Sequence, residues 1–73
     1  MRTDDFDFAS HGSICILTPL NESAIRWLEF HVINDETQFF GRGIAVEPRY
    51  VGALVEGIYR DGLTVAGIER RVH

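Results

Sequence analysis

Two segments of the chain repeat apolar residues at the spacing of an amphipathic helix. In residues 20–32, the apolar positions other than Phe30 share one half of the helix circumference, and Asn21 is the expected N-cap. In the second segment, Pro48 suits the first turn and Gly62 suits the left-handed position after the last turn. We therefore predict one helix that begins after Asn21 and a second over Pro48–Arg60.

Four shorter apolar segments predict strands. They are Ser13–Leu17, Thr37–Phe40, Ile44–Glu47 and Leu63–Ile68. Both faces of the first segment are apolar, which is typical of a central strand. Gly41-Arg42-Gly43 separates the second and third segments. A phosphate-binding loop needs a helix directly after its glycines, whereas a strand follows here, so the sequence favours a hairpin turn.

The resulting order, β-α-β-β-α-β, predicts an α+β fold in two layers. Two crossovers joined by a central hairpin give the ferredoxin-like arrangement, in which two helices cover one face of a four-stranded antiparallel sheet. We expect a single domain over residues 12–69, followed by a C-terminal tail over residues 70–73. Residues 1–11 are expected to be a flexible or loosely docked segment, because aspartates surround Phe6 and Phe8.

This fold leaves one face of the sheet without helices. Alternation along the second strand must place one ring of the Phe39-Phe40 pair on each face. Whether Ile14 and Ile16 or the alternate pair of the first strand points to the open face stays undecided. The candidate interaction residues are Phe6, Phe8, Cys15, Leu17, Phe39, Phe40 and Ile68. A monomer rarely leaves an apolar patch of several hundred Å² bare, so we expect a homodimer through the open face or an edge, with another protein as a possible partner.

Composition narrows the classes of function. A chain of 73 residues with one cysteine has no internal disulfide to stabilise its small core, which also favours oligomerisation. The net charge of −4 disfavours nucleic-acid binding. No apolar run has the length of a membrane span, and aspartates interrupt the start of the chain where a signal peptide would lie, so we expect a cytoplasmic protein.

Candidate chemistry is sparse. The three histidines, His11, His31 and His73, lie in different elements and form no local metal pair, and no cysteine cluster predicts zinc. Cys15 fits a small buried side chain better than a nucleophile. We therefore expect no catalytic, metal or cofactor-binding residues. The predicted function is a non-enzymatic interaction or assembly module. A small enzyme or ligand-binding domain with its site at a dimer interface is the alternative, and RNA binding is less favoured because the central strands lack aromatics.

A set of turn and core residues between about residues 12 and 65 is similar to small uncharacterised proteins of bacteria and their phages. These residues are Gly12-Ser13-Ile14, Leu17-Thr18-Pro19, Trp27, Ala45-Val46-Glu47, Arg49-Tyr50 and Asp61-Gly62-Leu63. The resemblance implies no activity and assigns no catalytic or binding residue.

Overall fold

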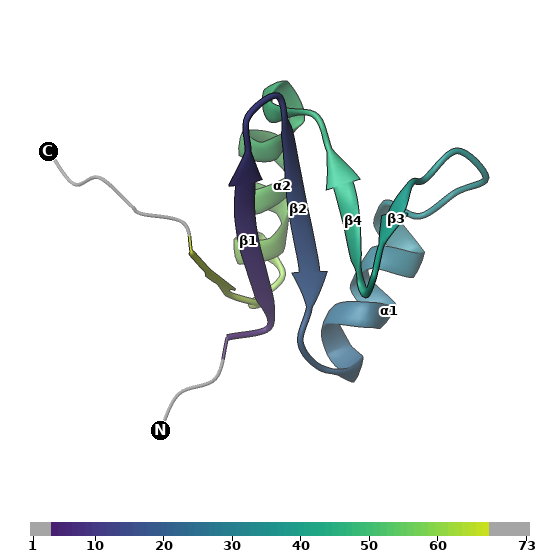
Figure 1. Cartoon of the computed structure of the whole chain (residues 1–73). Helices are drawn as coiled ribbons and strands as arrows, with labels where there is room; N and C mark the ends of the chain where they lie inside the picture. The colour runs from purple at the N-terminus through teal and green to yellow at the C-terminus, as the bar shows by residue number, and fades with distance from the viewer. Residues whose placement is uncertain (1–3, 68–73) are drawn as a thin grey trace, which may run out of the picture.

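The structure, a computed structural model, describes residues 4–67 of the chain. Within these residues the elements are β1 (Phe6–His11), β2 (Ile14–Pro19), α1 (Glu22–His31), β3 (Phe39–Phe40), β4 (Gly43–Val46), α2 (Pro48–Arg60) and β5 (Val65–Ala66) (Figure 1). The fold is therefore α+β, as the sequence predicts.

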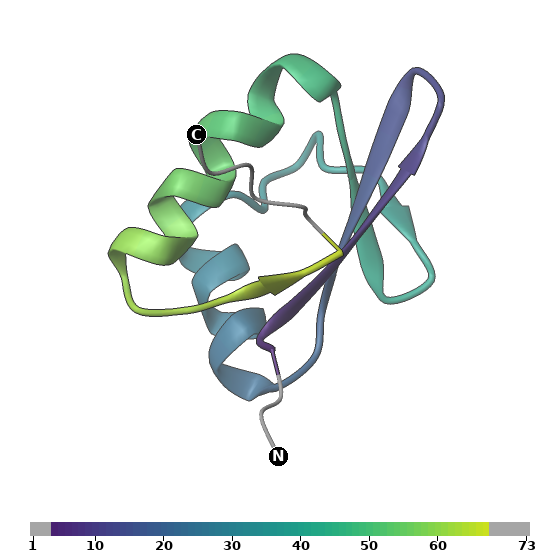
Figure 2. The same cartoon turned by 90° about the vertical axis from the view of Figure 1, so that its left-hand side faces the viewer.

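The strands form one mixed sheet in the order β3-β4-β2-β1-β5. β1 pairs with β5 in parallel, and the other neighbouring pairs are antiparallel. Both helices lie on the same side of this sheet, as Figure 2 shows. The prediction of two layers with helices on one face is therefore confirmed.

The predicted sheet of four antiparallel strands is wrong, because the sheet has a fifth strand and one parallel pair. The ferredoxin-like order is not confirmed. In that order the last strand would lie beside the strand that starts near residue 13, whereas β1 lies between β2 and β5. The cause is a hairpin at Gly12-Ser13, where His11 pairs with Ile14 and Gly12 has a φ of 68°. A two-residue turn with glycine first and at positive φ matches the twist of the strands that it joins.

The N-terminal segment is part of the sheet and not the loosely docked segment that we expected. Phe6 is completely buried and meets the ring of Trp27 edge-on at 6.0 Å between centroids. Asp5 fixes the start of β1, because its carboxylate accepts a hydrogen bond from the backbone N–H of Thr64 at 3.0 Å. Burial of a whole phenylalanine outweighs the preference of the nearby aspartates for water. Residues 1–3 and the expected tail at 70–73 lie outside the described residues.

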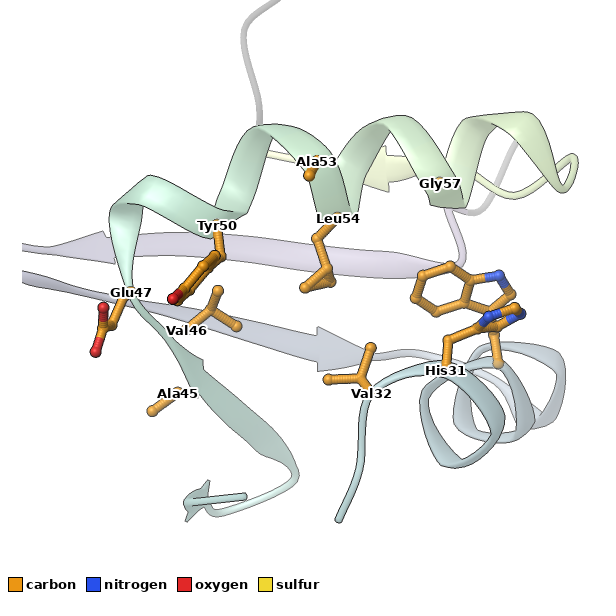
Figure 3. Close-up of a pocket in the computed structure, with 10 residues that line it drawn as sticks. His31, Val32, Ala45, Val46, Glu47, Tyr50, Ala53, Leu54 and Gly57 are labelled. Carbon is orange, nitrogen blue, oxygen red and sulfur yellow. The ribbon is translucent and has the colours of Figure 1, made fainter. Parts of the chain in front are cut away.

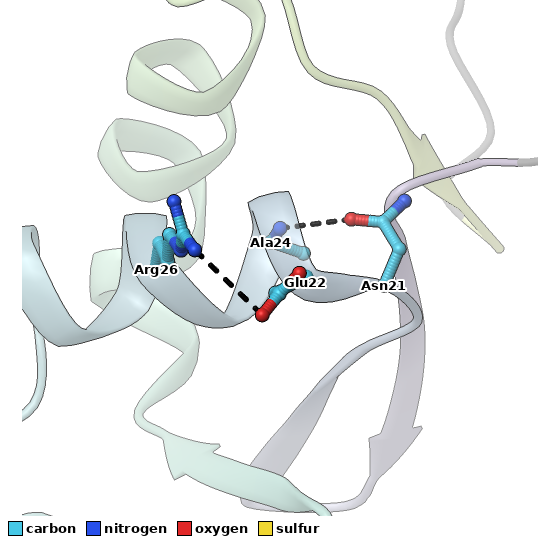
Figure 4. A network of polar contacts seen from close by, with 4 residues as sticks. All are labelled: Asn21, Glu22, Ala24 and Arg26. Carbon is cyan, nitrogen blue, oxygen red and sulfur yellow. Dashed lines mark hydrogen bonds and ion pairs between the residues drawn. The ribbon is translucent and has the colours of Figure 1, made fainter.

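The ends of both helices follow from their capping residues. The side chain of Asn21 accepts a hydrogen bond from the backbone N–H of Ala24 at 2.9 Å (Figure 4). α2 has the predicted bounds and ends in a Schellman motif, in which Leu63 N–H donates to Ile58 O at 3.0 Å. Gly62, with a φ of 86°, occupies the left-handed position that this motif requires.

The core lies between the sheet and the two helices. Its members are buried apolar side chains from both layers: Phe6, Leu17, Ala24, Leu28, Ile44, Val46, Ile58 and Val65. Cys15, as expected, is also buried. The core occupies the helix-facing side of the strands, so the candidate site must be sought on the open face, at the edges or between the helices.

Candidate functional site

The hairpin between β3 and β4 is the turn that the sequence predicts. Phe40 pairs with Gly43, so the turn consists of Gly41 and Arg42 alone. Gly41 has a φ of 59°, which a glycine adopts without strain, and Arg42 is exposed at the tip. Gly43 is the first residue of β4 and is buried. The glycines thus serve the backbone of a hairpin, and a strand follows them.

Phe39 and Phe40 lie on opposite sides of β3, as alternation predicts. Phe39 pairs with Ile44, whose side chain is in the core, so Phe39 shares the helix-facing side. Phe40 is opposite Gly43 on the other face. The two side chains are 57% and 52% exposed. β3 is an edge strand, and both of its faces therefore present an aromatic ring to solvent.

A groove beside β3 continues this apolar surface on the helix side. We call it the α1–hairpin groove; it has a volume of about 680 Å³. Its lining residues are Pro19, Leu20, Asn21, Glu22, Ile25, Leu28, Glu29, Ile33, Phe39, Gly41, Arg42 and Ile44. Leu20 and Ile25 are 47% and 43% exposed. The sequence placed both on the apolar side of the helix, but the core covers only part of that side, which hydrophobic periodicity alone cannot show.

The outer edge of β3 presents unpaired backbone groups. The N–H of Ala45 donates to the carbonyl oxygen of Gln38 at 2.9 Å, so Gln38 faces β4. In an antiparallel pair, residues alternate between facing the neighbour and facing away from it. The N–H and C=O of Phe39 therefore point out of the sheet, and no other strand of the described residues lies on that side.

The open sheet face has a small apolar centre. Ile16 pairs with Ala9 on one side and with Ala45 on the other, and Ile14 lies two residues before it on the same face. All four are partly buried. Ile14 and Ile16 are thus the open-face pair, whereas Cys15 and Leu17 point toward the helices and are buried.

The structure separates the seven candidate interaction residues into groups. Phe6, Cys15 and Leu17 are buried in the single chain. Phe8 is partly buried against the core, and Phe39 and Phe40 are exposed. Ile68 lies outside the described residues. The candidates that a single chain presents to a partner therefore gather at the β3 edge.

A second groove lies between α1 and α2 and has a volume of about 620 Å³ (Figure 3). We call it the α1–α2 groove. Val46 forms part of its floor, and Leu54 and Tyr50 of α2 point into it from one wall. Trp27 and His31 of α1 close one end, with their rings 4.5 Å apart. Most of the lining is apolar, so this groove suits an apolar ligand or side chain.

A polar cluster fixes the two rings at the end of the α1–α2 groove. The indole Nε1–H of Trp27 donates to Asp61 Oδ2 at 2.6 Å, and His31 Nε2 lies 3.5 Å from the same oxygen. The side chain of His31 is exposed. Asp61 thus holds the indole and the imidazole together at one end of the groove.

Three further observations bear on the class of function. Residues 4–67 hold no group of three or more histidine, cysteine, aspartate or glutamate side chains placed to bind a metal. In the same range, neither helix has the length and apolar character that crossing a bilayer requires. Comparison of the chain with protein families, curated proteins and solved structures finds no match. The function must therefore be argued from the surface itself.

Proposed function

We propose that the protein is a non-enzymatic protein–protein interaction module that acts as a homodimer, joined at the β3 end of its sheet. The observation that carries this proposal is the distribution of exposed large apolar side chains. Within the described residues these are Leu20, Ile25, Phe30, Phe39, Phe40 and Tyr50. Four of the six gather around β3: three line the α1–hairpin groove, and Phe40 lies on the other side of the strand. Such a patch with a polar rim is typical of an interface.

The small size of the chain supports a second copy as the partner. A domain of this length buries only about 60% of the surface of its unfolded chain, so its core stabilises it weakly. Its only cysteine is free, which leaves association as a source of added stability. A two-fold dimer also lets one patch serve both subunits, so no second complementary surface has to exist.

Sedimentation equilibrium at micromolar concentration tests the proposal. The expected mass is twice that of the chain. Ile25→Ser should raise the dimer dissociation constant by about tenfold, because it removes apolar area from the centre of the patch. Phe30→Ser is the matched control: Phe30 is in the same helix and 85% exposed, but does not line the groove. A monomeric mass across the micromolar range would reject the proposal.

A ligand-binding domain is the second candidate, favoured by the α1–α2 groove. Its apolar walls and the indole held by Asp61 form a surface that could bind an apolar aromatic molecule. The dye 1-anilinonaphthalene-8-sulfonate is a suitable probe, and the single tryptophan of the chain reports on it. Saturable quenching of Trp27 that Leu54→Ser weakens would favour this candidate. Absence of quenching would count against it without affecting the dimer proposal.

A further inference from the structure

We propose that the second copy joins through its own β3, antiparallel to the first, so that the two sheets become one across a two-fold axis at Phe39. This inference rests on the proposed function and specifies its geometry. The segment that pairs with the β3 edge is then β3 of a second, identical chain. Antiparallel pairing is required because a two-fold axis perpendicular to a sheet reverses the direction of the strand.

The backbone at Phe39 suits this pairing. Its N–H and C=O both point outward, since Gln38 uses its carbonyl toward β4. Two such residues facing each other across a two-fold axis exchange two hydrogen bonds, each N–H donating to the opposite C=O. Only an edge residue whose two groups are both free can form this self-complementary pair.

The side chains beside the axis suit the same arrangement. Phe39 of the second copy would lie next to Phe39 on the helix-facing side, at the mouth of the α1–hairpin groove. Extended segments that add to a sheet edge bind in this manner, with main-chain bonds along the strand and pockets for alternate side chains. Ile25 and Ile33 line the groove and supply apolar contacts for the incoming ring.

The charges that flank β3 complement each other in this arrangement. Arg42 lies in the turn after β3 and Glu36 in the loop before it, so an antiparallel pair with Phe39 at the axis brings the hairpin tip of each copy toward the loop of the other. Both side chains are exposed, and neither makes an ion pair within residues 4–67. Asp35 adds a second negative charge beside Glu36 in the loop that precedes β3. The hairpin tip is thus positive and the start of the strand negative, as an antiparallel pair of identical strands requires.

Within residues 4–67, the other edge of the sheet does not expose large apolar side chains. β5 is as short as β3, but its Val65 is buried in the core and its Ala66 is small. Natural proteins protect edge strands with charge, proline or a covering segment. β3 is also short, which limits its edge, but it exposes two phenylalanines and so offers an apolar surface for pairing.

A charge-swap experiment by sedimentation tests the register. Arg42→Glu and Glu36→Arg, each alone, should raise the dimer dissociation constant by about tenfold, because each places like charges together at two contacts. An equimolar mixture of the two variants should restore the wild-type constant. In the mixed dimer, each glutamate at one position faces an arginine at the other. Restoration in the mixture cannot come from a contact within one chain.

The possible outcomes distinguish the β3 pairing from the homodimer itself. A wild-type dimer that neither single variant weakens would overturn the β3 pairing and leave the homodimer intact. Weakened single variants that mixing does not restore would overturn the register and hence the inference. A monomeric wild type would reject the proposed function itself. Circular dichroism of both variants checks that these exposed substitutions leave the fold unchanged.

Discussion

Gly43 occupies a position in β4 where the neighbouring strand leaves no room for a side chain. An added Cβ at this position would lie 2.6 Å from Thr18 Oγ1 and 2.7 Å from Ile16 Cγ2. The side chains of β2 thus cover the start of β4 on the open face. The glycine is required here for space, because its φ is not in the left-handed region.

We expect Gly43→Val to destabilise the protein by about 1–3 kcal/mol, the usual cost of forcing atoms into a packed site. Urea denaturation measures the change. Gly52→Ala in α2 is the matched control, since its Cβ would meet nothing within 4 Å and alanine favours a helix by about 0.5–1 kcal/mol. A Gly43 variant as stable as the wild type would show that the side chains of Thr18 and Ile16 move aside to make room.

The contact between Trp27 and Asp61 is a second residue-scale feature. We expect Asp61→Ala to free the indole and shift its fluorescence emission to longer wavelength, because the ring loses the partner that holds it against α2. The stability should fall by about 1 kcal/mol, the typical net value of one hydrogen bond. Glu56→Gln, which changes an exposed carboxylate of α2 outside this contact and outside both grooves, is the control and should change neither quantity. An unchanged emission spectrum of Asp61→Ala would contradict the structural role of the contact.

At the scale of elements, β1 lies inside the sheet and contributes a fully buried ring to the core, although the sequence pattern places it outside the domain. We expect Phe6→Ala to cost about 3–5 kcal/mol, because the ring is fully buried. That loss approaches the whole stability of a small domain, so the variant should be largely unfolded by circular dichroism at 37 °C. Phe30→Ala, which removes an exposed ring, should change the stability by less than about 0.5 kcal/mol. A folded and stable Phe6 variant would mean that β1 is dispensable.

The elements that sequence predicted well are those with local signals. α2 has its stripe, its N-terminal proline and Gly62 at its end, and its bounds are as predicted. The hairpin at Gly41 was also predicted from its glycines. Gly12-Ser13 carries an equivalent turn signal, but the aspartates at the start of the chain favour a solvated segment in the sequence pattern. Charge near an apolar residue does not show whether that residue is buried.

At the scale of the whole molecule, association and folding should be coupled. If the dimer stabilises the fold, the midpoint of thermal unfolding rises with protein concentration, by mass action. Where the protein is largely dimeric, a hundredfold increase in concentration should add about 2.7 kcal/mol per mole of dimer, about half of that per chain, to the stability. Calorimetry over that range measures the midpoint. Arg42→Glu should need a higher protein concentration than the wild type to reach the same unfolding midpoint, because its dimer is weaker. A wild-type midpoint that does not depend on concentration would indicate a monomer.

The sequence by itself determined the two helices, their caps, the central hairpin and the alternation that separates Phe39 from Phe40. These features depend on neighbours within a few residues, so periodicity and turn chemistry suffice to predict them. Only the tertiary structure decided the place of β1 between β2 and β5, the face on which Ile14 and Ile16 lie, and the exposure of Leu20 and Ile25. Those depend on which distant segments pair and how far the core extends, because burial is a property of the packed chain and not of the local pattern.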